Sequence, residues 1–110
     1  EGKTVILKIE VQGAEKIRSL YPDSVSIFLM PPSLRILEER LRRRETEDED
    51  EINRRLSIAV GEIKRSVEYD YYVINDVVGY AVSDICAIIQ AEKQRTFRMK
   101  NIISEVINNA

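Results

Sequence analysis

The stretch Val25–Arg44, VSIFLMPPSLRILEERLRRR, decides the fold that we expect. Residues 25–30 form an almost uniformly apolar run, which is typical of a strand buried on both faces of a sheet. Two prolines end that run, and Ser33 is a residue type that caps helix N-termini. Residues 34–44 then place leucines at helical spacing. The stretch therefore predicts a buried strand followed at once by a helix.

Strands and helices alternate on both sides of this unit. The expected elements are a strand over 5–11, a helix over 14–20, a long helix over 51–67, a strand over 71–74, a helix over 79–95 and a short amphipathic tail within 96–110. The order β-α-β-α-α-β-α favours an α/β fold with a mainly parallel sheet and helices packed on its faces. We expect residues 1–110 to belong to a single domain, since no linker or repeat interrupts the pattern.

The composition excludes several classes of function. The net charge is −2 and the sequence pI is about 5.3, so we expect neither a nucleic-acid nor an anionic-membrane partner. The chain has no histidine, which excludes histidine-based catalysis and histidine metal ligands. Cys86 is the single cysteine, which fits a reducing compartment, and no apolar run reaches the ~20 residues of a membrane span. We therefore expect a cytoplasmic protein.

Four arginines gather at the end of the helix predicted over 34–44. Arg42 and Arg43 each follow a glutamate by four residues, the favourable spacing for helix ion pairs. Arg40 and Arg44 lie four apart on one face, where like charges repel, and neither follows an acid at that spacing. Their charge suits the helix C-terminus, which is a purely structural reading. Two forked guanidiniums on one face also suit a bridging polyanion such as a nucleotide phosphate.

A second arginine pair, Arg54 and Arg55, follows acidic residues at the same spacing of four. Surface ion pairs are the default reading for these two side chains. Residues 45–51 (ETEDEDE) lie between the arginine groups and are too polar to bury. They are either a solvated loop or a mobile lid that closes when an anionic ligand arrives.

Polar residues near predicted strand ends are further candidates. Glu10 lies near the end of the first predicted strand, where ligands of open α/β sheets bind, and its carboxylate either faces water or accepts hydrogen bonds from a base. Asn75 and Asp76 follow the strand over 71–74, and a plain turn also explains them. Residues 2–4 (GKT) resemble the end of a phosphate-binding loop but precede a strand instead of a helix, so we read them as a turn.

Four segments in order resemble the guanylate kinase family. Residues 5–14 (VILKIEVQGA) are similar to its V-[IL]-L-[DE]-I-D-V-Q-G-A segment, and residues 28–33 (FLMPPS) to its F-I-x-P-P-S turn. Residues 40–47 followed by 52–56 resemble its lid motif R-L-x-x-R-x-T-E…I-x-x-R-L. Residues 70–76 (DYYVIND) resemble D-Y-V-V-V-N-D. The chain departs from the first pattern at two positions, with Glu10 in place of Asp and Lys8 in place of an acid.

The resemblance implies phosphoryl transfer from ATP to GMP with Mg2+, and guanylate kinase as the parent enzyme. It implies that Arg40, Arg44 and Arg55 are catalytic phosphate ligands, that Glu10 binds the guanine of the substrate, and that Asn75 lies near the adenine of ATP. Arginines delivered by a closing segment suit a reaction that depends on positioning and charge stabilisation. No metal ligand is expected among the residues of this chain.

The resemblance also implies a partial fold of the P-loop nucleoside monophosphate kinases. The family sheet has strand order 2-3-1-4-5, and this chain would supply strands 3, 4 and 5 with a lid at about 44–52. The first strand, the phosphate loop and most of the GMP-binding region would precede Glu1. We therefore expect the chain alone to be inactive and to pair with the missing N-terminal half, or with itself, through exposed sheet edges. The alternative is a non-catalytic guanylate-kinase-like protein-interaction module.

Overall fold

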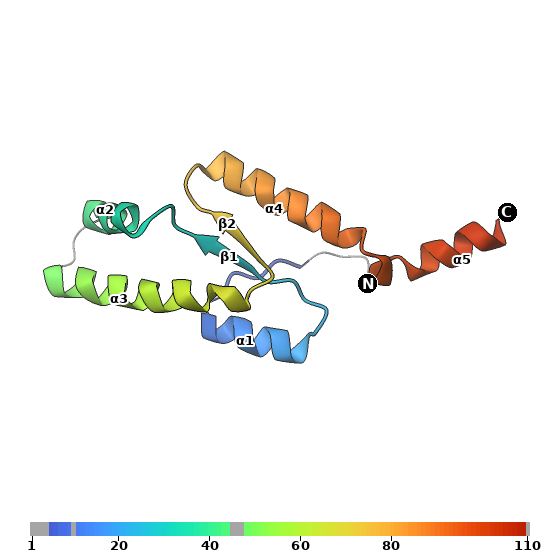
Figure 1. Cartoon of the computed structure of the whole chain (residues 1–110), viewed down its shortest axis with the longest axis horizontal. Coiled ribbons are helices and arrows are strands. Elements are labelled where there is room, and N and C mark those ends of the chain that lie inside the picture. Colours follow the sequence, from blue (N-terminus) through green and yellow to red (C-terminus); the bar gives the residue numbers. More distant parts are fainter. Residues whose placement is uncertain (1–4, 10, 45–47, 110) are drawn as a thin grey trace. The chain divides into compact units, whose positions relative to one another are not determined.

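The computed structural model describes residues 5–9, 11–44 and 48–109 of the chain. The chain divides into two compact units, residues 1–74 and residues 75–110. Figure 1 shows the elements in chain order: α1 (Val11–Leu20), β1 (Ile27–Met30), α2 (Leu34–Arg44), α3 (Glu49–Arg65), the 3-10 helix η1 (Ser66–Glu68), β2 (Tyr71–Ile74), α4 (Val78–Lys93), the 3-10 helix η2 (Thr96–Arg98) and α5 (Lys100–Asn108).

The first unit contains a two-stranded parallel sheet. β1 pairs with β2 in a register that runs from Ile27 opposite Tyr71 to Met30 opposite Ile74. Parallel neighbours need a long crossover connection, and α2 and α3 supply it. The expected α/β fold with a parallel sheet is therefore confirmed, and the two strands predicted over 25–30 and 71–74 are both present.

Hydrogen bonds between Ser26 and Asp70 join the residues that precede the two strands. Ser26 donates its backbone N–H and its hydroxyl to Asp70 Oδ2, at 2.8 and 3.1 Å. The backbone N–H of Asp70 is 3.0 Å from Ser26 Oγ and 3.1 Å from Ser26 O. Since these bonds lie one residue ahead of the first pair of the ladder, they fix the parallel register at its start.

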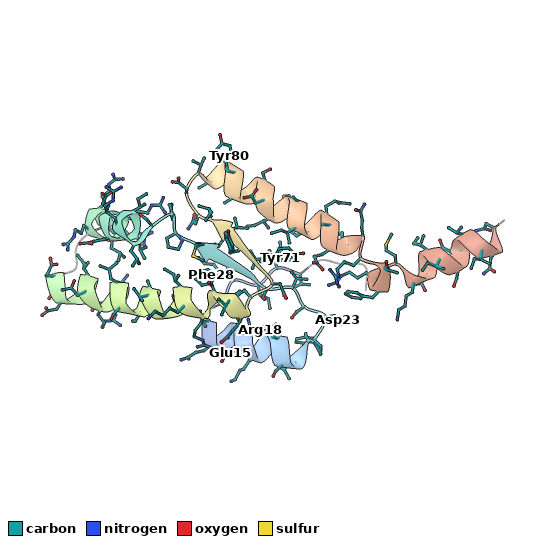
Figure 2. All side chains as sticks on the ribbon, in the orientation of Figure 1. Glu15, Arg18, Asp23, Phe28, Tyr71 and Tyr80 are labelled. Carbon is teal, nitrogen blue, oxygen red and sulfur yellow. The ribbon has the colours of Figure 1, made fainter. Side chains whose placement is uncertain are left out.

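Helix α1 lies against the end of α3 and η1. Arg18 forms an ion pair with Glu68 at 3.5 Å, and its guanidinium stacks over the Tyr69 ring at 5.0 Å from the centroid. Arg65 pairs with Glu15, and Figure 2 shows Glu15 and Arg18 together on α1. The Tyr69 ring also meets Phe28 of β1 edge-on, at 5.3 Å between centroids. The most buried apolar side chains of this unit are those of Val11, Ala14, Ile52 and Val73.

The strand predicted over 5–11 is wrong. Residues 5–9 lie in no strand, and Val11 is already the first residue of α1. The side chains of Val5, Ile6 and Leu7 are 77%, 73% and 58% exposed. A strand needs a neighbour that satisfies its backbone donors and acceptors, and the described part of the chain pairs none with this segment.

The helices of the crossover match their predicted positions closely. α2 spans the predicted range Leu34–Arg44, and Ser33 Oγ accepts the N–H of Ile36 at 3.1 Å as its cap. α3 begins at Glu49, two residues before its predicted start. Asp48 is the N-cap of α3, and its carboxylate accepts the N–H of Glu51 at 2.9 Å. A carboxylate at that place also opposes the positive end of the helix dipole.

The second unit consists of α4, η2 and α5. Arg95 and Arg98 both approach Glu92 at the end of α4, at 3.8 and 3.6 Å. The same two guanidiniums lie over the Phe97 ring, 5.5 and 4.5 Å from its centroid. These contacts hold η2 to the end of α4. None of the described helices is long and apolar enough to cross a membrane.

Candidate functional site

The predicted arginine ligands gather on the helical hairpin formed by α2 and α3. Arg40 and Arg44 lie in the last turns of α2, and Arg55 lies in the second turn of α3. Both helices belong to the first unit and contact one another, as Figure 1 shows. The hairpin therefore brings residues that are eleven to fifteen positions apart in sequence onto neighbouring elements.

Arg42 joins the two helices of the hairpin through two glutamates. Its Nε and Nη2 donate to Glu38 Oε2 at 3.0 and 2.8 Å. Its Nη1 and Nη2 donate to Glu49 Oε1 and Oε2, both at 2.8 Å, in the bidentate geometry of an arginine and a carboxylate. The hydrogen bonds of Arg42 lower the pKa of the Glu49 carboxyl, and those of both glutamates raise the pKa of Arg42. We call Arg42, Glu38 and Glu49 the Arg42 cluster.

The pairing of Arg42 with Glu38 was expected from their spacing, whereas the contribution of Glu49 was not. Glu49 lies seven residues after Arg42 and on the other helix, and only the fold brings it there. The N-cap Asp48 has a signal in the sequence, because Asp48-x-x-Glu51 has the spacing of a helix capping box.

Arg40 and Arg44 occupy the face of α2 opposite to Arg42. Each is two residues away from Arg42, which in an α-helix corresponds to a rotation of about 160°. Arg40 is half-buried and Arg44, the last residue of α2, is exposed. The hairpin thus separates one arginine that holds the helices together from two that share the opposite face of α2.

Glu51 accepts hydrogen bonds from both arginines of the second pair, Arg54 and Arg55. Arg54 Nε donates to Glu51 Oε1 at 3.1 Å, and Arg54 Nη2 also pairs with this carboxylate. Arg55 Nε donates to Glu51 Oε2 at 3.2 Å, as its spacing of four predicts. Hydrogen bonds from Arg54, and then from Arg55, lower the pKa of Glu51 to about 2. Arg55 is therefore held beside a carboxylate that remains ionised over the whole range from neutral to moderately acidic pH.

The remaining predicted site residues are less informative. Glu10 lies outside the described residues. Asn75 follows β2, is exposed and begins the second unit. Of the predicted lid at about 44–52, residues 45–47 lie outside the described residues, while 48–52 form the cap and first turn of α3. Within the described ranges, no three carboxylates or thiols group as metal ligands.

Fold and site together define a class of protein: an α/β protein whose parallel strands are connected by a helical hairpin rich in arginine. A family model described as Guanylate kinase matches residues 1–92. The chain belongs to the guanylate kinase family.

Curated relatives support the same assignment. A guanylate kinase from Hydrogenovibrio crunogenus is 47% identical over 108 residues, which are 98% of this chain and 53% of the relative. One from Shouchella clausii is 47% identical over 106 residues, covering 96% and 52%, and one from Halalkalibacterium halodurans is 50% identical over 98 residues, covering 89% and 48%. The chain spans about half the length of the curated relatives it matches.

Proposed function

We propose that this chain is the lid-bearing, ATP-side part of a guanylate kinase, which transfers the γ-phosphoryl group of ATP to GMP and yields ADP and GDP. The observation that carries the proposal is the α2–α3 hairpin, which presents three arginines of the family lid motif on adjoining helices. Family membership and the name shared by the relatives support it.

In this proposal Arg40, Arg44 and Arg55 bind the phosphates and stabilise the charge that develops on the transferred group. Phosphoryl transfer depends on positioning and on charge stabilisation, which planar guanidinium groups provide through paired hydrogen bonds. Glu10 binds the guanine of GMP, and Asn75 lies beside the adenine of ATP. The lid at about 44–52 closes over the phosphates.

Magnesium belongs to the proposal as the companion of ATP. The described residues do not offer a cluster of oxygen ligands that fits a divalent cation. We therefore assign no magnesium ligand to this chain and derive no step from the ion. Its contribution when bound is to neutralise charge on the β- and γ-phosphates.

The 110-residue chain is expected to be inactive by itself, since its sequence contains no complete G-x-x-x-x-G-K-[ST] loop to hold the β- and γ-phosphates. A chimera tests the proposal directly. In it, the portion of the Hydrogenovibrio crunogenus guanylate kinase that precedes the matched region is fused to residues 1–110. We expect the chimera, and not the isolated chain, to transfer phosphate from ATP to GMP in a coupled ADP-release assay.

Arginine variants of the chimera test the site. Arg44→Ala and Arg55→Ala are expected to lower kcat by about 10²–10³, the range for removing one group that stabilises the transition state. Arg43→Ala removes the same charge from the same helix and should leave kcat within about twofold. An equal loss in all three variants would reject the assignment. A folded but inactive chimera would favour the alternative of a protein-interaction module.

A further inference from the structure

We propose that Arg42 is a positioning residue, which holds the end of α2 to the start of α3 through Glu38 and Glu49 and so sets the spacing of Arg44 and Arg55 for a polyphosphate. This inference rests on the proposed function for its ligand. The family motif R-L-x-x-R leaves the position of Arg42 open, whereas it requires arginine at the positions that match Arg40 and Arg44.

The hydrogen bonds of Arg42 carry the proposal. Its Nε, Nη1 and Nη2 atoms make four contacts of 2.8–3.0 Å with two carboxylates. A guanidinium engaged in this way has little remaining capacity for a phosphate. Two of its contacts lie within α2 and two cross to Glu49 in the first turn of α3, so Arg42 joins the C-terminal end of α2 to the N-terminal end of α3.

The position of the Arg42 cluster explains why it affects the ligand site. Arg42 lies two residues before Arg44 and on the opposite face of α2, so the cluster does not compete for the space in front of Arg44. Glu49 lies six residues before Arg55 on α3. A helix end that is free to fray would move Arg44 independently of Arg55, whereas a fixed end keeps the position of Arg44 constant relative to Arg55.

The direction in which Glu49→Gln changes the affinity for a polyanion distinguishes a positioning role from an effect of charge alone. Glu49→Gln removes a negative charge from the hairpin, and charge alone predicts tighter binding of a polyanion. The Arg42 cluster predicts weaker binding, because the variant loses the contact between the helices. Asp50→Asn is the matched control, since it removes one negative charge from the same first turn of α3 outside the cluster.

The test is titration of the 110-residue chain with inorganic tripolyphosphate at low ionic strength. We expect Glu49→Gln to bind about threefold more weakly than Asp50→Asn, a modest effect because the side chains of Arg42 and Glu49 are 42% and 62% exposed. Arg42→Gln should bind more weakly than Arg43→Gln by a similar ratio. Arg42→Lys keeps the positive charge but lacks the planar guanidinium that donates to two carboxylates. It should therefore bind more tightly than Arg42→Gln and more weakly than the wild type.

Amide hydrogen exchange gives a readout that needs no ligand. The amides of residues 41–44 and 51–53 should exchange about threefold faster in Glu49→Gln than in Asp50→Asn. Binding by Glu49→Gln that equals or exceeds that of Asp50→Asn overturns the proposal, as does a wild-type chain that binds no tripolyphosphate. An inactive chimera instead counts against the proposed function, while the affinity and exchange ratios still decide the role of Arg42.

Discussion

Residues 40–55 contain six arginines and six acidic residues, so the average charge of the hairpin does not attract an anion. What distinguishes the arginines is the partner that each one meets. Arg42 is engaged by two carboxylates on two helices, and Arg54 and Arg55 share Glu51. Glu51 lies beside Arg55 and accepts from its Nε, while Arg40 and Arg44 lie on the other face of α2 from the Arg42 cluster.

Glu51 provides a pH-dependent prediction at this scale. Its pKa is lowered to about 2 in the folded chain, chiefly by hydrogen bonds from Arg54. A carboxyl with a lowered folded-state pKa adds stability above its ordinary pKa and loses that contribution as the pH falls toward the folded value. The stabilisation by Glu51 should therefore be complete at pH 7 and fade between about pH 4.5 and pH 2.

Urea unfolding of the wild-type chain and of Glu51→Gln at pH 7 and pH 2.5 measures this effect. The wild type should unfold at higher urea than the variant at pH 7, and the difference between the two midpoints should be much smaller at pH 2.5. Asp50→Asn serves as control, since it removes a neighbouring charge from the same turn. A difference between wild type and Glu51→Gln that is the same at both pH values would contradict the assignment.

Among the secondary-structure elements, those whose bounds depend on nearby residues were predicted correctly from the sequence. Ser33 and the leucine spacing identified α2 over its whole length, and the apolar runs identified β1 and β2. The sequence predicts the start of α3 two residues late, because a run of acidic residues is typical of a solvated loop and also suits the first turn of a helix. The contact of Glu49 with Arg42 depends on how two helices meet, which residue spacing along one helix does not encode.

The pairing of β1 with β2 depends on the hydrogen bonds between Asp70 and Ser26. Asp70→Ala removes the acceptor of the Ser26 N–H and hydroxyl, and should lower the free energy of unfolding by about 1–2 kcal/mol. Ser26→Ala removes only the hydroxyl and should cost less. Because the two residues contact each other, the double variant should lose less than the sum of the single losses in urea unfolding. Strictly additive losses would show that the hydrogen bond from the Ser26 hydroxyl to the Asp70 carboxylate contributes nothing.

At the scale of the whole molecule, the wrong prediction for residues 5–11 has a physical cause. The composition VILKIEV fits a strand, but strand propensity expresses packing against neighbours more than an intrinsic backbone preference. The described chain pairs β1 with β2 and places no strand beside residues 5–9. The sheet order that the resemblance implies would supply that neighbour from the first strand, which the chain is expected to lack. A sequence pattern can predict a strand, but the segment forms one only when a neighbouring strand pairs with its backbone.

The exposed apolar run at residues 5–7 leads to the last prediction, that the chain associates with itself. In a two-stranded sheet each strand keeps one edge that no described strand covers, and such edges accept an extended segment from another chain. We expect residues 5–9 of one copy to add to a sheet edge of a second copy. Sedimentation velocity at increasing protein concentration should then show a shift from monomer toward dimer.

Leu7→Lys tests the site of that association. A lysine in the middle of the added segment places a charge where backbone and apolar side chains would be buried, and should weaken association about tenfold. Val67→Lys is the matched control, because Val67 is 85% exposed and lies in η1, outside both strands. If Leu7→Lys and Val67→Lys weaken self-association equally, residues 5–9 do not form the contact between the two copies. Adding the N-terminal half of a guanylate kinase should reduce the self-association, because the sheet order that the resemblance implies would place a strand of that half at this edge.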